Sequence, residues 1–131
     1  MTKKIVEKRR FPRHEVYTPA QLEMFDDSFP VSVEELSIEG LTIRSSRSIA
    51  PETYVAIRIN VGRDIVFHCQ IVWIANILTG SKEDMYKMGL QIDAILDRGN
   101  EIIDIAEREI LIQDLIVIIK RVDADYNCNE S

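Results

Sequence analysis

The chain contains the stretch Ile65-Val66-Phe67-His68-Cys69-Gln70-Ile71-Val72-Trp73, in which apolar side chains recur at every second position. Side chains of a β-strand point alternately to its two faces, so this period predicts a strand with one buried and one exposed face. We expect the buried face to carry Ile65, Phe67, Cys69, Ile71 and Trp73, opposite His68 and Gln70. Cys69 is then predicted to be a buried free thiol.

The same period continues on both sides of this stretch. Alternating runs cover residues 54–61 and 86–94, and earlier strands are expected near residues 16–25, 31–37 and 41–46. Turn-forming residues separate the runs, for example at Glu39-Gly40 and Gly62-Arg63-Asp64. Six short strands at this spacing predict a mainly β fold, a six-stranded antiparallel β-barrel over residues 15–96, because closing the sheet leaves no free edge.

The pattern becomes helical after residue 96. Asn100 is a typical N-cap, acidic residues follow it, and Lys120 and Arg121 stand where a helix dipole favours bases. We therefore expect a long C-terminal α-helix from about residue 101 to residue 121, within a segment that spans residues 97–122. The polar residues 123–131 are predicted to form a flexible tail.

The predicted helix carries more apolar residues than one buried face requires. One side can hold Ile103, Ala106, Ile110 and Val117, and another Ile105, Ile112, Ile116 and Ile119, with Leu111, Leu115 and Ile118 between them. A helix that covers a barrel needs a single apolar face. The surplus, which would leave Ile112, Ile116 and Ile119 in water, predicts a second contact, either with another copy of the chain in a homo-oligomer or with an unidentified protein partner.

Length and composition restrict the class of protein. The 131 residues, 46% of them hydrophobic, fit one domain with its own core. The most apolar stretch, residues 110–119, is too short to span a bilayer and contains Asp114, so we expect no membrane insertion. There is no apolar N-terminal signal, and the two cysteines lack metal-ligand spacing, which favours a reducing cytoplasm. His14 and His68 have no partner pattern for catalysis or metal binding, and the sequence has no nucleotide-hydrolysis motif, P-loop or Cys–His pairing, so we expect no enzyme activity.

Two polar segments do not suit a hydrophobic core. The first is the basic arm Lys8-Arg9-Arg10-Phe11-Pro12-Arg13, and the second is the turn Glu35-Leu36-Ser37-Ile38-Glu39-Gly40. Residues 1–14 hold six Lys/Arg and one Glu, a formal charge of +5, so the remaining 117 residues carry −11 of the total of −6. Guanidinium groups bind phosphates bidentately and stack on flat rings. The acidic body would repel a long phosphate array, so the two segments predict a small anionic ligand that carries a base.

The order and spacing of these segments resemble those of the PilZ domains, which are bacterial receptor modules for cyclic di-GMP. The family pattern is R-x-x-x-R in an N-terminal arm, followed by [Asp/Asn]-x-Ser-x-x-Gly on the barrel. Arg9 and Arg13 match the first motif, and Ser37 and Gly40 match the second, whereas Glu35 stands where the family prefers Asp or Asn. Residues 70–73 and 86–92 are similar to the family's two closing strands.

The resemblance implies a cyclic di-GMP receptor that changes conformation on binding and signals to a protein partner. Arg9 and Arg13 would stack on guanine and grip the phosphates, and Arg10 would add to the positive field. The opposite side of the ligand would be held by Glu35, Ser37 and Gly40, and Trp73 could stack on a base. The ligand that the resemblance implies is cyclic di-GMP, and no further cofactor and no metal are expected.

Other readings of the same residues stay open. Residues 1–14 could be a solvated basic terminus, Ser37 and Gly40 an ordinary hairpin turn, and Trp73 a core residue. A PilZ-like barrel without nucleotide binding could act as a protein-interaction adaptor through its C-terminal helix, which the extra methylene of Glu35 favours. Small barrels with basic arms can also bind single-stranded nucleic acid, but the acidic body and few aromatic residues argue against that class.

Overall fold

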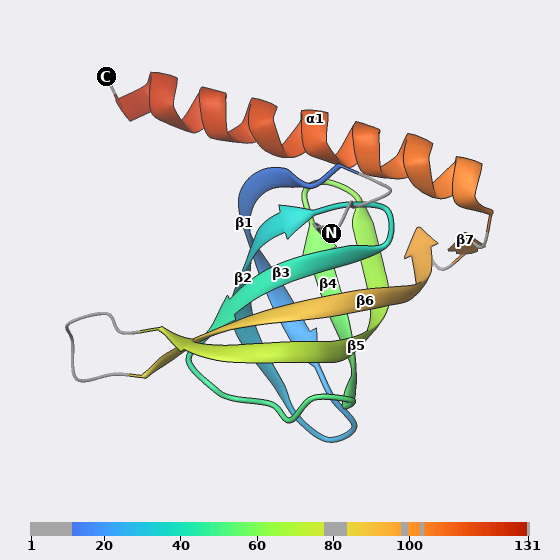
Figure 1. Cartoon of the computed structure of the whole chain (residues 1–131). Helices are drawn as coiled ribbons and strands as arrows, with labels where there is room; N and C mark the ends of the chain where they lie inside the picture. Colours follow the sequence, from blue (N-terminus) through green and yellow to red (C-terminus); the bar gives the residue numbers. More distant parts are fainter. Residues whose placement is uncertain (1–11, 78–83, 98–99, 103, 131) are drawn as a thin grey trace, which may run out of the picture.

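The computed structural model describes residues 12–77, 84–97, 100–102 and 104–130 of the chain. For residues 100–102 and 122–130 it describes the backbone alone. A strongly twisted sheet wraps around one core, and a long helix lies across one end of it (Figure 1).

Six long strands form this sheet: β1 (His14–Glu23), β2 (Ser28–Leu36), β3 (Gly40–Ser45), β4 (Tyr54–Asn60), β5 (Asp64–Ile77) and β6 (Met85–Asp97). They follow one another in the order β3-β2-β1-β4-β5-β6, and β3 also pairs with β6, so the sheet closes on itself. All of these pairings are antiparallel. The predicted six-stranded antiparallel barrel is therefore confirmed. A short additional strand, β7 (Asn100–Ile102), pairs with β6.

The predicted alternation fills the inside of the ring. Ile65, Phe67, Cys69 and Ile71 of β5 are buried, whereas His68 is exposed. Phe67 and the central apolar residues of the neighbouring strands belong to one continuous core. Cys69 is a free buried thiol, as the pattern predicted, and its burial raises the pKa of the thiol.

The prediction that Trp73 shares this buried face is wrong. The register between β5 and β6 shifts after Ile71, which pairs with Leu90, whereas Trp73 pairs with Gly89. Val72 is the extra residue of this β-bulge, and one extra residue exchanges the faces of everything that follows it. Trp73 therefore lies on the outside of the barrel and remains 39% exposed, whereas Ile74 packs partly against the core.

The C-terminal helix begins later and ends later than predicted. Helix α1 comprises Ile105–Glu130, and Asn100, the predicted N-cap, lies in β7, where it pairs with Asp97. The carboxylate of Asp104 instead accepts a hydrogen bond from the backbone N–H of Ala106 at 2.7 Å and caps the first turn. Residues 123–130, predicted as a flexible tail, continue the helix. Lys120 and Arg121 consequently lie in its middle rather than in its last turn.

Helix α1 closes one end of the barrel with a single apolar face. Its buried residues join the barrel's own core: Leu111, Ile112, Leu115, Ile116 and Ile119. The prediction that Ile112, Ile116 and Ile119 form a surplus face is therefore wrong. The helix is tied down at its start, because Arg108 Nη2 donates to the Asp93 carbonyl at 2.8 Å. Within the described residues, no helix is both long enough and apolar enough to cross a membrane.

Candidate functional site

The turn between β2 and β3 is built around the side chain of Ser37. Its hydroxyl accepts hydrogen bonds from the backbone N–H groups of Glu39 (3.3 Å) and Gly40 (3.2 Å) and lies 3.2 Å from the Gly40 carbonyl, to which it can donate. The Ser37 N–H also donates to this carbonyl at 2.9 Å. Ser37 is only 3% exposed, so in this state its polar atoms shape the turn.

Gly40 is required by the close packing of β3 against β6. A Cβ atom on Gly40 would lie 2.7 Å from the carbonyl oxygen of Leu90, which is closer than real Cβ atoms approach. The positive φ that a glycine permits is not used here, since Gly62 is the glycine with positive φ among the described residues. The glycine of this motif thus holds the turn close to β6.

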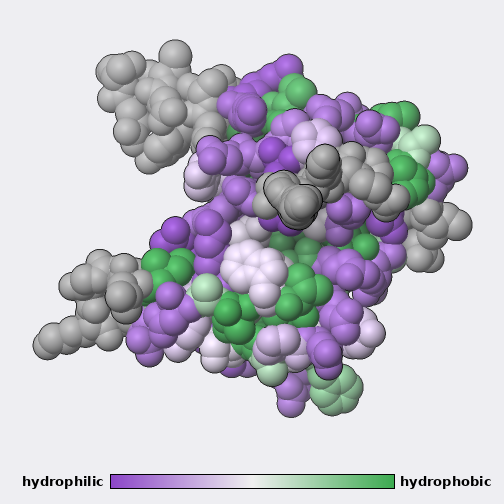
Figure 2. All heavy atoms as spheres, in the orientation of Figure 1, coloured by the Kyte–Doolittle hydropathy of each residue, from purple (hydrophilic) through white to green (hydrophobic). Residues whose placement is uncertain are grey.

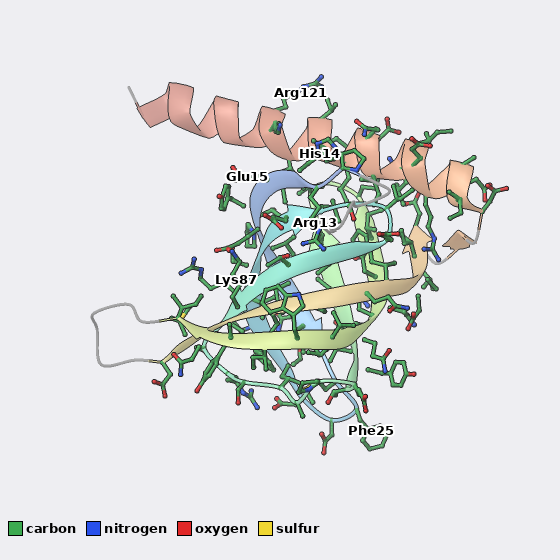
Figure 3. The ribbon with its side chains drawn as sticks, in the orientation of Figure 1. Arg13, His14, Glu15, Phe25, Lys87 and Arg121 are labelled. Carbon is green, nitrogen blue, oxygen red and sulfur yellow. The ribbon has the colours of Figure 1, made fainter. Side chains whose placement is uncertain are left out.

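Arg13 and Glu35 meet beside this turn. Arg13 directly precedes β1, and its Nη1 lies 3.5 Å from Glu35 Oε1 (Figure 3 labels Arg13). The hydroxyl of Thr42 donates to the same carboxylate oxygen at 3.3 Å. The Arg13 and Glu35 side chains are 35% and 30% exposed, so both remain accessible to a ligand. The two motifs, 22 positions apart in sequence at these residues, are therefore in contact.

The flank of this pair on β1 and β2 is acidic. Glu15 and Glu35 are cross-strand partners, and Tyr17 lies near them in a bulge with a φ of 50°. The negative charge of Glu15 above all, then partial desolvation, and then the charges of Glu34 and Glu35 raise the pKa of Tyr17. The Arg13 guanidinium is thus a cation at the edge of a negative field.

An open pocket of about 360 Å³ joins the two motifs to β5 and β6. Among its described lining residues, Arg13 supplies a permanent cation, and Ser37 and Gly40 supply part of a tight turn. The remaining lining residues come mainly from the closing strands: Glu39, Val72, Leu90, Gln91 and Ile92. Such a mixture of an apolar floor and a few polar groups is typical of a small-molecule site.

Trp73 lies on the same outer face as this pocket. Cross-strand pairing sets up one row, in which Glu35 is next to Thr42, Thr42 next to Gly89, and Gly89 next to Trp73. Three strand spacings separate the ends of the row, roughly 14 Å. The indole covers Gly89, where a Cβ atom would lie 2.4 Å from its Cε2. Figure 2 shows an apolar area in the middle of this face, with hydrophilic side chains around it.

The structure therefore brings together most of the predicted site residues that it describes. Arg13, Ser37 and Gly40 line one pocket, Glu35 contacts Arg13, and Trp73 stands on the same face. Arg9 and Arg10 lie outside the described residues.

Sequence reasoning missed residues that no motif marked. In the sequence these are ordinary strand positions. In the structure Thr42 donates a hydrogen bond to Glu35, and Val72 and Gln91 line the pocket. Gly89 did carry a signal, because a glycine inside a strand often marks the close approach of another group.

Another hollow of about 360 Å³ lies on the β4, β5 and β6 wall, and Tyr54 and His68 are among its lining residues. None of its described lining residues is Lys or Arg, so it suits an anion less well than the pocket at Arg13. Among the described residues, no group of three His, Cys, Asp or Glu side chains could hold a metal ion.

Comparisons with known proteins agree with this fold. The sequence model of the PilZ domain matches residues 7–108. The PilZ domain of YcgR from Escherichia coli, solved with c-di-GMP, superimposes with a TM-score of 0.62 at 15% identity, over 95% of this chain and 100% of that one. MrkH from K. pneumonia in its apo state gives a TM-score of 0.59 at 18% identity, over 90% of this chain and 56% of that one. This chain therefore spans little more than half of MrkH.

No curated protein sequence matches the chain. At identities of 15% and 18%, the two structures show a similarity of fold alone. The family model, however, matches well over half of the chain and spans both the Arg13 arm and the Ser37 turn. The chain belongs to the PilZ domain family.

Proposed function

We propose that this chain is a receptor domain for cyclic di-GMP. The observation that carries the proposal is the pocket in which Arg13 meets the Ser37–Gly40 turn. Arg13 of the first motif directly precedes β1, Ser37 and Gly40 of the second belong to the β2–β3 turn, and all three line this pocket. The YcgR domain, which has the same fold, was solved with c-di-GMP, which supports the same class of ligand here.

The proposed roles follow from the chemistry of the side chains. The Arg13 guanidinium is planar and permanently charged, so it can grip a phosphate and stack on guanine. Glu35 can accept two hydrogen bonds from a guanine edge. Trp73 offers a flat surface on which a base can stack. Arg9 and Arg10 are proposed to contribute further positive charge, because Arg9 matches the first arginine of the motif and Arg10 is its neighbour.

Binding is proposed to act as a switch rather than as a step of catalysis. The ligand would hold the N-terminal arm, residues 1–14, against the barrel and so change the surface offered to a protein partner in the cytoplasm. This mechanism requires that cyclic di-GMP bind the closed arrangement more tightly than the open one.

One specific observation favours an adaptor that does not bind nucleotide. Arg13 is already paired with Glu35, and the Ser37 hydroxyl already bonds within its own turn. A ligand would have to compete with these contacts. In that case the barrel would serve to present helix α1 to a partner, and cyclic di-GMP would not bind.

Calorimetric titration with cyclic di-GMP distinguishes the two proposals. The wild type should bind, and Arg13→Ala should bind at least about tenfold more weakly, because a hydrogen bond to a charged group contributes about 1.5–3 kcal/mol. Arg58→Ala is the matched control. Arg58 is similarly exposed (40%) and also ion-paired, to Glu23 and Asp64, but it lies on β4 outside the pocket.

The control variant should bind as tightly as the wild type. Equal binding by Arg13→Ala and wild type would show that the site is elsewhere. A wild type that gives no heat with cyclic di-GMP would favour the adaptor.

A further inference from the structure

Helix α1 carries an apolar stripe that the barrel does not cover. Ile110 and Val117 are 65% and 53% exposed, and Ala106 is exposed as well. At 100° per residue, these three positions fall within about 40° of one another. They lie opposite the face that buries Leu111 and Leu115 against the barrel core. We call Ala106, Ile110 and Val117 the outer stripe.

The charges beside the outer stripe are divided along the helix. Towards its start, Glu107 and Glu109 stand on either side of the stripe, and towards its middle, Arg121 and Lys120 do the same. The helical angle places Glu107 on the same flank as Arg121, and Glu109 on the same flank as Lys120. All four residues are exposed.

We propose that the outer stripe is the contact through which two copies of this chain form an antiparallel helix pair. In a two-fold pair each contact is made twice, and each flank meets the same flank of the other copy. If Ile110 of one copy packs on Val117 of the other, Glu107 comes level with Lys120 and lies one residue from Arg121. Both flanks then set acids against bases, so the helix is complementary to its own antiparallel copy and repels a parallel one.

Asp114 lies near the two-fold axis of this pair and faces its own copy. The repulsion is partly offset within each chain, because Arg63 Nη1 lies 3.9 Å from the Asp114 carboxylate. Arg63 is held in place by Asp97, at 2.6 Å, and so does not depend on Asp114. Asp114→Asn should therefore strengthen self-association, an effect that would not be expected if the stripe served a partner of unrelated sequence.

Sedimentation velocity of the full chain over a range of concentrations tests the proposal. The wild type should show a concentration-dependent monomer–dimer equilibrium. Two variants reverse the flanks: Glu107→Lys with Glu109→Lys, and Lys120→Glu with Arg121→Glu. Each alone sets like charges against each other in the homodimer and should associate at least about tenfold more weakly, a change of about 1.4 kcal/mol. An equimolar mixture of the two variants should restore association, because the new lysines of one variant then meet the new glutamates of the other.

Circular dichroism of each variant checks that it is folded, as expected for substitutions at exposed positions. A wild type that stays monomeric at every concentration would overturn the proposal and would leave the stripe to a different partner. Reversed variants that associate as well as the wild type, or a mixture that does not associate, would overturn the antiparallel register.

Discussion

Gly89→Ala is the substitution that most directly tests how the proposed site is built. A Cβ atom at this position would lie 2.1 Å from Trp73 Nε1, 2.4 Å from Cε2 and 2.8 Å from Cδ1, too close for the indole to stay where it is. All three contacts are with a side chain on the outside of the barrel, so the indole can swing away without moving the backbone. We expect a folded protein in which Trp73 has left its place.

The expected change in the free energy of unfolding is small. Exposing about 50 Å² of indole surface costs about 1.2 kcal/mol at about 25 cal/mol per Å². Replacing glycine by alanine inside a strand returns about 0.5–1 kcal/mol, since alanine loses less backbone entropy on folding. The two effects nearly cancel, so the stability should stay within about 1 kcal/mol of the wild type. Binding should change more, because stacking of a base on an aromatic ring contributes about 1–3 kcal/mol.

Intrinsic fluorescence reports on this change directly, because Trp73 is the single tryptophan of the chain. Gly89→Ala should shift the emission to longer wavelength, increase quenching by acrylamide and weaken cyclic di-GMP binding. Trp73→Ala should weaken binding by a similar factor, and the double variant should be no weaker than either. Unchanged emission together with unchanged affinity in Gly89→Ala would refute both the stacked indole and its role in the site.

Three further substitutions test other parts of the structure. Ile116→Lys should unfold the chain, at a cost of about 4 kcal/mol or more, because it places an ammonium group in the core; Val117→Lys, one residue on and exposed, should remain folded. Glu35→Asp should bind cyclic di-GMP as well as wild type or better, because a shorter acid releases Arg13; much weaker binding in parallel titrations would contradict this. In a Cys128→Ser variant, Cys69 should react slowly with a thiol reagent until denaturant is added, because the thiol is buried and its pKa is raised. Rapid labelling of the folded protein would show that the core opens.

The barrel could be predicted because its strands follow a simple period over most of their length. Apolar side chains alternate through Ile65, Phe67, Cys69 and Ile71, and those four positions are buried. The signal ends at Ile71-Val72-Trp73-Ile74, where every residue is apolar and either face could be the inner one. The pairing of Trp73 with Gly89 turns Trp73 outward, and the alternation of apolar residues does not reveal this pairing.

The sequence also left undecided where the helix begins and which of its faces is buried. Asn100 and Asp104 are both good N-cap residues. Asn100 lies in β7, where it pairs with Asp97 of β6, so Asp104 caps the helix instead. Within the helix, apolar residues surround the axis from Ile110 to Ile119, so composition could not identify the buried face. Contact with the barrel selects Ile112 and Ile116 and leaves Ile110 exposed.

Three of the four register shifts among the described strand pairs lie near the candidate site, whereas the fourth, between His68 and Cys69, lies at the other hollow. The β1–β2 ladder is broken next to Tyr17, the β2–β3 ladder at Glu34, and the β5–β6 ladder at Val72. A bulge re-aims the side chains that follow it, and bulges are common beside binding sites for that reason. Here the bulge at Val72 turns Trp73 out of the core and onto the face that carries Glu35. Deleting Val72 removes the extra residue but leaves Trp73 opposite Gly89, so the indole should stay on the outer face with its emission unchanged, while cyclic di-GMP binding should weaken because Val72 lines the pocket. An emission maximum that moves to shorter wavelength in the deletion variant would show that the indole has turned into the core and that Trp73 is not held opposite Gly89.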